Sequence, residues 1–469
     1  MNCLRVFRFA SAGIVVVAAL SGHAASAASV QPAASLAPAI STSGDDSSVR
    51  ETIRWLESRV QKDADDFVAY NKLGALYLQR LRETGDATFL AQTFRAARAS
   101  LAALPAGQNK QGLNLLAQAE FAAHDFVAAR DHARTLVRME PDKAYPYQTL
   151  GDALLELGDY DAAEAAFRRM QELDGVQNIT RVATQQRLGR LAILRGDTAA
   201  AQRSFARALE LALALPVPPR ETVAWCRWQL GETAFSRGDY AAAEQHYRDA
   251  LIAFPDYFRA LASLGRVRAA RGDPAGALAH YESAVKILPD PAFVAALGDL
   301  YLLSGRERDA ARQYDLVEAI ARLGAAGGAL YNRQQALFYA DHDRKPEEAY
   351  AMAVREYAVR RDIYGADAVA WTALKAGRIG EAQAMIKAAL RLNTRDARLY
   401  YHAGMIAHAA SDMTAARDFF ARALALNPQF DPLQAFVARK VAQAGIEAMG
   451  GAAAAISHAT PNPIAAARR

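Results

Sequence analysis

A leucine–glycine pair recurs along the chain at nearly constant spacing, and this repetition limits the fold more than any other feature. The pairs begin at Leu73, Leu150, Leu188, Leu230, Leu264 and Leu297. The last three of these, in the centre of the chain, follow one another at almost equal intervals. A period of about 34 residues indicates one small structural unit repeated many times, which stacks on its neighbours because it cannot bury its apolar face alone.

Each unit predicts two helices joined by a glycine turn. In the central unit, Ala243 and Tyr247 share one face of the second helix. Gly238 lies between the helices, where it can adopt the left-handed conformation that ends the first helix. Asp239 can then cap the second helix, and Pro255 ends the unit because proline cannot continue a helix.

Three of these turns spell Arg-Gly-Asp, a tripeptide often interpreted as a cell-adhesion signal. The copies lie at 195–197, 237–239 and 271–273, so that they follow the repeat period once with and once without an insertion. The turns at Gly158 and Gly377 keep the glycine and lose one or both charged neighbours. A helix cap requires only the glycine, so we interpret the tripeptide as structural.

This pattern resembles the tetratricopeptide repeat (TPR), a helix–turn–helix unit of about 34 residues. Degenerate copies at Leu116, Ala336, Val369 and Ala403 extend the resemblance over most of the chain and bring the number of units to ten. The resemblance implies an all-α fold, an α-solenoid of about ten stacked TPR units that forms a right-handed superhelix. It also implies that the first helices of the units line a concave surface that binds extended peptides or partner helices.

Residues 1–27 have the features of a secretory signal peptide. Arg5 and Arg8 form a short basic region, an apolar stretch of signal-peptide length follows at residues 9–20, and residues 25–27 form a small-x-small cleavage site. The apolar stretch is short for a membrane anchor, and no later stretch is long enough to span a bilayer. We therefore expect a periplasmic or secreted protein without a transmembrane segment after cleavage.

The protein is not expected to be a lipoprotein, because His23 stands where a lipidated cysteine would be needed. Cys226 is the only cysteine after cleavage, so no internal disulfide can form, and we expect it to be a packing residue. The expected organisation after the signal peptide is a flexible linker at 28–47, a capping helix at 48–64, the solenoid at 65–429, a solvating helix at 430–447 and a disordered tail at 448–469.

No catalytic motif stands out, so we expect no enzyme activity, no metal and no cofactor. Asp341-His342-Asp343 is the one tight ionisable cluster, but adjacent residues on a helix point in different directions and cannot converge on one ion. The net charge of +5 is modest and no block of lysine or arginine occurs, so the sequence does not indicate a nucleic-acid partner.

The resemblance places candidate binding residues at fixed offsets from the leucine–glycine pairs, on the face of the first helices that lines the concave surface. Transferred to this chain, these offsets give Tyr145, Asp152, Arg190, Trp225, Trp228, Glu232, Phe235, Arg259, Arg266, Tyr331, Phe338, Tyr364, Trp371 and Tyr401. Tyrosine, tryptophan and arginine are common anchors of protein interfaces. The alternative is that these bulky side chains pack against the next repeat, or against a C-terminal segment that folds into the groove.

The leading hypothesis is a non-catalytic protein–protein interaction scaffold in a bacterial cell envelope. It predicts that replacing Trp225 and Trp228 with alanine weakens capture of the partner without unfolding the solenoid. A second hypothesis is a scaffold for polysaccharide assembly or export, because aromatic rings also stack on sugars. A third is an enzyme that uses the Asp341-His342-Asp343 turn.

Overall fold

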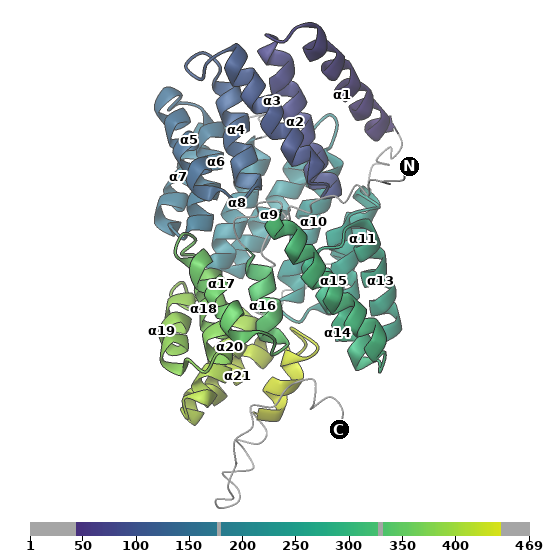
Figure 1. Ribbon diagram of the computed structural model, residues 1–469, viewed down its shortest axis with the longest axis vertical. Helices are drawn as coiled ribbons and strands as arrows, with labels where there is room; N and C mark the ends of the chain where they lie inside the picture. The colour runs from purple at the N-terminus through teal and green to yellow at the C-terminus, as the bar shows by residue number, and fades with distance from the viewer. Residues whose placement is uncertain (1–43, 176–179, 327–331, 442–469) are drawn as a thin grey trace, which may run out of the picture.

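The chain is helical throughout the part that the structure describes (Figure 1). This computed structural model describes residues 44–175, 180–326 and 332–441. The helices are α1 (Gly44–Lys62), α2 (Phe67–Thr84), α3 (Thr88–Ala103), α4 (Lys110–Ala122), α5 (Phe126–Met139), α6 (Ala144–Leu157), α7 (Tyr160–Leu173), α8 (Thr180–Leu194), α9 (Thr198–Leu213), α10 (Arg220–Phe235), α11 (Tyr240–Ala253), α12 (Phe258–Ala270), α13 (Pro274–Ile287), α14 (Pro291–Leu303), α15 (Glu307–Ala326), α16 (Arg333–Asp341), α17 (Pro346–Tyr357), α18 (Ile363–Lys375), α19 (Ile379–Ala389), α20 (Ala397–Ala409) and α21 (Met413–Leu426), followed by helical residues 434–441. No strand occurs within these ranges, and the predicted all-α fold is confirmed.

From α2 to α21 the described helices form ten successive antiparallel pairs, so that unit 1 is α2 with α3 and unit 10 is α20 with α21. The predicted solenoid of ten units is therefore confirmed. The leucine–glycine pair explains how the two helices of a unit approach each other. A Cβ atom added to Gly231 would lie 2.4 Å from the ring of Tyr247 on the second helix, and Gly151 and Phe167 repeat this contact at 2.2 Å. Glycine is needed because the aromatic ring lies directly on the backbone of the first helix.

The Arg-Gly-Asp turns are structural, as predicted. Their glycines have φ between 72° and 75°, in the left-handed region. Asp197 and Asp239 accept hydrogen bonds from the backbone N–H groups of Ala200 and Ala242, so each caps the second helix of its unit. Arg195 donates to the preceding unit, where it lies 2.7 Å from a carboxylate oxygen of Asp161.

First helices of neighbouring units pack against one another, as α4 does against α2 and α6, whereas the second helices are spread apart. This difference places the first helices on the inner, concave side of the solenoid. The joint between units 7 and 8 is looser than the others, because α15 and α16 make few contacts with each other. Residues 327–331, which connect them, lie outside the described ranges.

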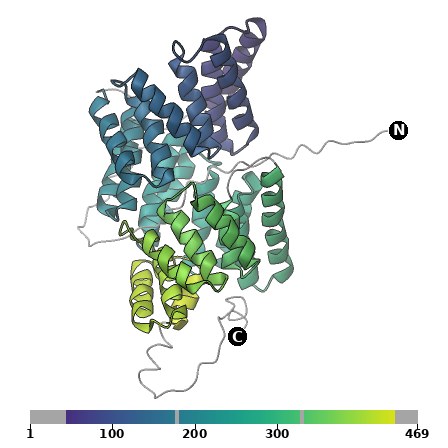
Figure 2. The ribbon, with the colours of Figure 1, turned by 60° about the vertical axis from the view of Figure 1, so that its left-hand side comes forward.

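The solenoid winds so tightly that its C-terminal units pack against units 3 to 5. Figure 1 and Figure 2 both show the green C-terminal helices directly below the blue N-terminal helices. Turns within units meet loops between units, in register: Gly158 meets residues 361–362, Gly196 meets residues 393–395 and Gly238 meets residues 426–428. The turn of unit 1 is placed in the same way, because Gly85 lies against the side chain of Leu288 after unit 6. We call these contacts the seam. Each turn meets the loop that follows the unit five positions later, so one revolution takes about five units.

Hydrogen bonds cross the seam at three places, the turns of Gly158, Gly196 and Gly238. At the first, the backbone N–H of Arg361 donates to the carbonyl oxygen of Leu157 at 3.2 Å, and the N–H of Ile363 donates to the hydroxyl of Tyr160 at 2.8 Å. At the second, the Thr394 hydroxyl donates to the carbonyl oxygen of Leu194. The first place thus joins main chain to main chain, and at the second a side chain binds a main-chain carbonyl.

At the third place, a single side chain makes the connection. The amide nitrogen of Asn427 donates to the carbonyl oxygen of Phe235 at 2.8 Å, and its amide oxygen accepts from the hydroxyl of Tyr240 at 2.6 Å. Asn427 is completely buried. It therefore satisfies polar groups that are enclosed between the two revolutions of the solenoid.

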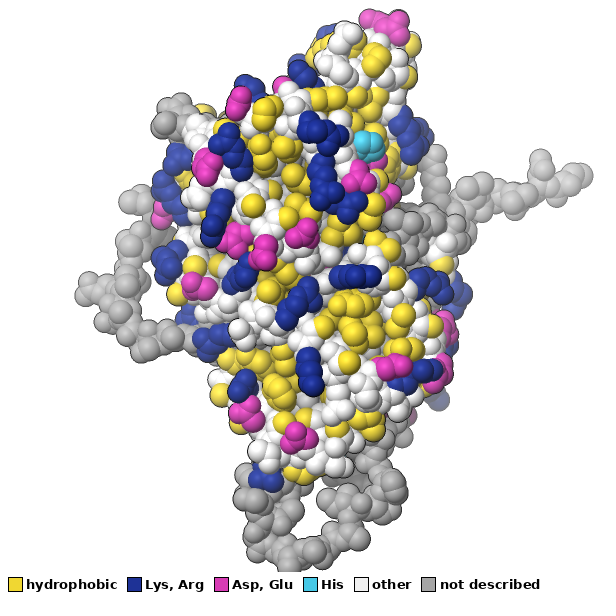
Figure 3. Space-filling model, turned by 90° about the vertical axis from the view of Figure 1, so that its left-hand side faces the viewer, with side chains coloured by type: hydrophobic (Ala, Val, Ile, Leu, Met, Phe, Trp, Pro, Cys, Tyr) yellow, Lys and Arg dark blue, Asp and Glu magenta, His cyan; other side chains and the backbone are white. Residues whose placement is uncertain are grey.

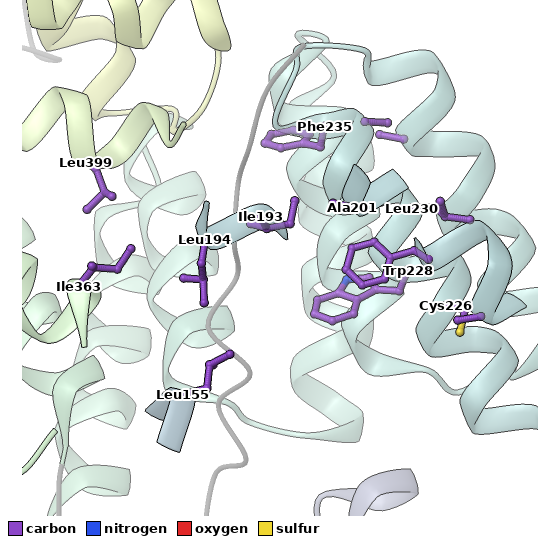
Figure 4. Packing of buried hydrophobic residues seen from close by; sticks show 14 of the residues in the cluster. Leu155, Ile193, Leu194, Ala201, Cys226, Trp228, Leu230, Phe235, Ile363 and Leu399 are labelled. Carbon is purple, nitrogen blue, oxygen red and sulfur yellow. The ribbon is translucent and has the colours of Figure 1, made fainter. Parts of the chain in front are cut away.

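Apolar side chains fill the space behind these hydrogen bonds (Figure 4). Leu155, Ile193 and Leu194 come from the C-terminal ends of α6 and α8, and they share one buried core with Ile363 on α18 and Leu399 on α20. All five side chains are less than a tenth exposed. Side chains from two successive revolutions of the solenoid thus form part of the same hydrophobic core.

Helix α1 begins at Gly44 and therefore extends four residues into the predicted linker. It packs on α2 through Leu56, which is 1% exposed, together with Ile53 and Val60. The predicted signal peptide, most of the linker, the end of the solvating helix and the tail lie outside the described residues. None of the described helices has the length and apolarity that a membrane-spanning helix needs.

Candidate binding surface on the concave face

The structure places thirteen of the fourteen predicted binding residues on first helices, and Tyr331 lies outside the described residues. Their exposure divides them into two groups. The buried group consists of Asp152, Trp228, Glu232, Phe235, Phe338, Trp371 and Tyr401. The partly exposed group consists of Tyr145, Arg190, Trp225, Arg259, Arg266 and Tyr364. Only the second group offers side-chain surface that a partner could reach in this conformation.

Four of the predicted charged residues form ion pairs between consecutive first helices. Arg266 on α12 pairs with Glu232 on α10 at 2.5 Å, and Arg190 on α8 pairs with Glu156 on α6 at 2.9 Å. In both pairs the residues are 34 positions apart, so they occupy comparable places in neighbouring units. Asp152 is likewise bound by an arginine of the next first helix, Arg187.

Glu232 is the most enclosed of these acids, with 3% of its surface exposed. Its carboxylate accepts hydrogen bonds from the hydroxyls of Tyr247, at 2.6 Å, and Ser263, at 2.9 Å, as well as from Arg266. A buried carboxylate with this many donors is satisfied inside the fold. We therefore assign Glu232 to the stacking of units 5 and 6, in place of the predicted contact with a partner.

Several predicted aromatic anchors also serve the stacking. The indole nitrogen of Trp228 donates to Ser263 of the next unit at 3.0 Å. The ring of Trp371 stacks on His402 of the next unit with 4.2 Å between ring centroids. Phe338 packs against Tyr314 of the preceding unit at 5.7 Å. The alternative stated from the sequence, that these bulky side chains pack against a neighbouring repeat, describes this group.

Two further residues belong to the seam. Phe235, 1% exposed, lies in the shared hydrophobic core (Figure 4), and its carbonyl oxygen accepts from Asn427. Tyr364 follows Asp362, which caps α18, and its ring packs on the same core. The end of the concave face at units 3 to 5 is thus covered by the C-terminal units of the chain itself.

The remaining accessible residues lie on α6, α8, α10 and α12. The hydroxyl of Tyr145 donates to Glu140, and burial together with this carboxylate raises the pKa of Tyr145 above its usual range. Trp225 packs edge-on against Phe205, with 5.8 Å between ring centroids. The guanidinium of Arg259 lies 4.6 Å from the ring centroid of Phe258. These aromatic and cationic groups are held in place by the fold and keep part of their surface exposed.

An ionic network joins units 3 and 4 to units 8 and 9, and sequence reasoning missed it. Glu156 accepts from Arg190 at 2.9 Å and from Arg360 at 2.5 Å. Burial by itself would raise the pKa of Glu156, but the nearby guanidinium groups lower it to about 2. Arg333 continues the network by binding Asp362. The spacing of Glu156 and Arg190 is visible in the repeat period, whereas Arg360 is 204 residues away and gives no such signal.

The side chains of Asp341, His342 and Asp343 do not point toward a common site. Asp341 accepts from the indole of Trp371, and the Nε2 atom of His342 bonds to Asp299 at 2.8 Å. Asp343 turns the other way and pairs with Lys375 at 2.6 Å. Among the described residues, no group of histidine, cysteine and carboxylate side chains is arranged to hold a metal ion. Cys226 is buried, and burial raises the pKa of its thiol to about 12.

Models of the tetratricopeptide repeat family match residues 114–177, 180–254, 229–292 and 369–429. Together these matches cover about half of the chain. The chain belongs to the tetratricopeptide repeat family. The family supports a protein–protein interaction scaffold as the general function of this TPR protein. No curated protein sequence matches it.

Several solved structures are similar to parts of this chain at low identity. PilW, a type IV pilus biogenesis factor, is 17% identical, with 45% of this chain and 93% of PilW covered and a TM-score of 0.38. PilF of Pseudomonas aeruginosa is 18% identical, with 50% and 95% covered and a TM-score of 0.36. Human IFIT1 is 12% identical, with 81% and 87% covered and a TM-score of 0.44.

The outer face of the TPR solenoid differs from the concave face in character. Figure 3 shows the side on which α5, α7 and α19 lie, where basic side chains are scattered among acidic and hydrophobic ones. The second helices there carry many local ion pairs, such as Arg168 with Glu164 and Arg422 with Asp418. Exposed pairs of this kind contribute little to the stability of the fold.

Proposed function

We propose that the protein is an exported scaffold of a bacterial cell envelope, which binds a segment of a partner protein on the concave face of units 3 to 6. The observation that carries this proposal is the row of partly exposed side chains on consecutive first helices: Tyr145, Arg190, Trp225 and Arg259. Because neighbouring units hold these side chains, binding would require little ordering of the scaffold, which favours affinity.

The cellular setting rests on the sequence. The basic residues, apolar stretch and small-x-small site within residues 1–27 support export through a cleaved signal. Fractionation of cells that express the full chain, compared with a chain lacking residues 1–27, tests this directly. Recovery of both forms in the cytoplasm would exclude the envelope setting.

Trp225 is the residue to test for binding, and the double replacement expected from the sequence is unsuitable. Trp228 is 5% exposed and bonds to Ser263, so its removal would damage the stacking of units 5 and 6. We expect Trp225→Ala to reduce partner capture about tenfold, because tryptophan is a frequent hot-spot residue. The measurement is quantitative crosslinking in native envelopes, with circular dichroism to verify that the variant is folded.

Trp55 on α1 supplies the matched control. It is 55% exposed and lies on the helix that precedes the ten units. Trp55→Ala should leave capture unchanged. If Trp225→Ala captures as much partner as Trp55→Ala does, the concave face of units 3 to 6 is not the binding surface.

A further inference from the structure

The seam pairs only half of the turns and half of the loops. Each turn meets the loop that follows the unit five positions later, so within the ten described units the turns of units 6 to 10 and the loops after units 1 to 5 have no counterpart. Among the described residues, a Cβ atom at Gly272, Gly305 or Gly377 would meet no atom within 4 Å. We call these turns, with the helix ends beside them, the turn edge, and these loops, with the helix ends before them, the loop edge.

The turn edge exposes an apolar side chain at a position that is buried within the seam. Leu194 stands two residues before the turn glycine Gly196, and it is 3% exposed in the core that two revolutions share. Leu303 stands two residues before Gly305 in unit 7, and it is 44% exposed. Because the repeat gives Leu194 and Leu303 the same place in their units, Leu303 is suited to a contact of the kind that Leu194 makes.

The position two residues after the turn gives the same result. Tyr160 occupies it in unit 3, where it is 5% exposed beneath residues 361–363. Ile379 occupies it in unit 9 and Met413 in unit 10, and these side chains are 36% and 40% exposed. Units 7, 9 and 10 thus each present an apolar side chain where the seam would bury it.

The loop edge carries a second row of exposed apolar side chains. Leu426 stands two residues before the proline that ends unit 10, beside Gly238 in the seam, and it is 9% exposed. Met139 has the same place in unit 2 and is 38% exposed. Val217, in the loop after unit 4, is 72% exposed, and Ile252, near the end of α11 in unit 5, is 67% exposed.

The two edges differ in charge in a way that favours contact between them. In units 2 and 3, residues 139–143 and 172–175 of the loop edge contain four carboxylates and one lysine. In units 7 to 9, residues 303–307, 343–346 and 377–380 of the turn edge contain four basic side chains and two carboxylates. Some of the basic side chains already pair with their own chain, as Lys345 does with Glu318, but exposed pairs of this kind are weak. Opposite charges would therefore guide the two edges together.

We propose that copies of this chain stack end to end, with the turn edge of one copy against the loop edge of the next, so that the seam continues from copy to copy. Units 7 to 10 lie at the end of the molecule away from α1, so the two edges face outward at opposite ends (Figure 1). The contact joins two different surfaces, and each added copy offers both edges again. Such a contact produces an open series of dimers, trimers and longer assemblies. This inference goes beyond the proposed function and does not depend on the surface proposed at units 3 to 6.

The test is sedimentation velocity of the chain from residue 28 onward, measured over a series of concentrations. We expect the average sedimentation coefficient to rise continuously with concentration as longer assemblies form. A turn-edge variant, Ile379→Asp with Met413→Asp, and a loop-edge variant, Val217→Asp with Ile252→Asp, should each raise the dissociation constant by about tenfold or more, because a charge replaces apolar surface that the contact buries.

A mixture of the two variants tests the direction of stacking. The turn-edge variant keeps an intact loop edge, and the loop-edge variant keeps an intact turn edge. Equal amounts of both should therefore form a dimer of one copy of each, and this dimer should not grow, because both of its outer edges carry the substitutions. If the mixture stays as monomeric as the separate variants, the two edges do not bind each other and the proposal is wrong.

Leu323→Asp with Val354→Asp is the matched control. These side chains are 47% and 40% exposed on the second helices α15 and α17, and they belong to neither edge. The control variant should associate as the unchanged chain does, and circular dichroism verifies that all three variants are folded. Equal loss of association in the control variant would show that the edges are not the contact.

The unchanged chain supplies the remaining outcomes. A chain that is monomeric at every concentration, or a dimer that does not grow, would overturn end-to-end stacking. If the chain is monomeric and associates only after residues 442–469 are removed, this segment occupies the turn edge in place of a second copy, and the proposed occupant is wrong.

Discussion

The seam predicts that two glycines with the same backbone conformation respond differently to the same substitution. Gly158 and Gly272 both end the first helix of a unit with positive φ, at 84° and 75°. A Cβ atom at Gly158 would lie 2.3 Å from the carbonyl oxygen of Arg361 across the seam. At Gly272 it would meet no atom within 4 Å. The pair therefore separates backbone strain from loss of the seam.

The magnitudes follow from the two situations. Both Gly158→Ala and Gly272→Ala place a side chain in the left-handed region, which costs about 1–2 kcal/mol. At Gly158 the clash with backbone atoms adds about 1–3 kcal/mol of overpacking. Separation of the two segments at the seam also breaks the Arg361–Leu157 hydrogen bond, which contributes about 1 kcal/mol. We expect Gly158→Ala to lower the free energy of unfolding by about 2–4 kcal/mol more than Gly272→Ala.

The assay is urea unfolding followed by circular dichroism, with hydrogen exchange to locate the effect. A solenoid can unfold in stages, so the midpoint of the first transition is the quantity to compare. The backbone N–H of Ile363, which donates to Tyr160 across the seam, should exchange faster in Gly158→Ala and at the original rate in Gly272→Ala. Equal destabilisation by the two substitutions, with unchanged exchange at Ile363, would refute the seam.

Three further predictions concern buried polar groups. Asn427→Ala leaves the carbonyl oxygen of Phe235 without its donor, and it should cost about 2–4 kcal/mol in urea unfolding; a loss below about 0.5 kcal/mol, the size typical of surface substitutions, would contradict its role. Burial opposes the charge of His342, but the carboxylate of Asp299 favours it and raises the pKa of His342 to about 9. This ion pair should therefore stabilise the fold fully below about pH 6.5. Its contribution of about 3 kcal/mol should be lost as the pH rises through 9. His342→Gln should remove this alkaline dependence from thermal unfolding curves, and an unchanged dependence would count against it. Burial, followed by the charge of Arg360, lowers the pKa of His124 to about 4. The unfolded chain therefore binds a proton at a higher pH than the folded chain does, and the protein should lose stability as the pH falls from 6.5 through 4. His124→Asn should reduce this loss of stability in the same measurement.

The features that repeat with the unit could be predicted from the sequence. The aspartate caps at Asp197 and Asp239, the turn glycines and the ten helix pairs all depend on residues within one unit or its neighbour, so the period reveals them. The seam could not be predicted in this way. Tyr160 and Ile379 both begin second helices directly after the turn, yet Tyr160 is 5% exposed beneath the C-terminal units and Ile379 is 36% exposed. The period gives them equal environments, and only the winding of the whole chain distinguishes them.

In the candidate site, too, some features follow from the repeat and others from the winding of the whole chain. The offsets located the first-helix positions correctly, because helix geometry fixes which side chains share a face. They could not show that Phe235 lies in the core of the seam, because its neighbours there include Leu399, which belongs to unit 10 on the next revolution. Pairing between repeats was more accessible, since Glu232 and Arg266 are separated by the length of one unit. The period therefore predicts which side chains lie on the first helices, while long-range contacts decide which of them remain accessible.

The seam also restricts how a partner could bind. In an open solenoid the whole inner face is available to an extended segment, but here the C-terminal units cover the end of that face at units 3 to 5 through Ile363 and Leu399. A partner has two routes. It can use the part that stays partly exposed around Trp225 and Arg259, in which case Gly158→Ala should leave affinity nearly unchanged. Alternatively, the partner can open the seam and bind the surface that the C-terminal units cover at units 3 to 5. In that case Gly158→Ala should strengthen binding, because the substitution already reduces the free energy needed to open the seam. Whether Gly158→Ala leaves the affinity unchanged or strengthens it thus decides whether the seam stays closed when the partner binds or must open first.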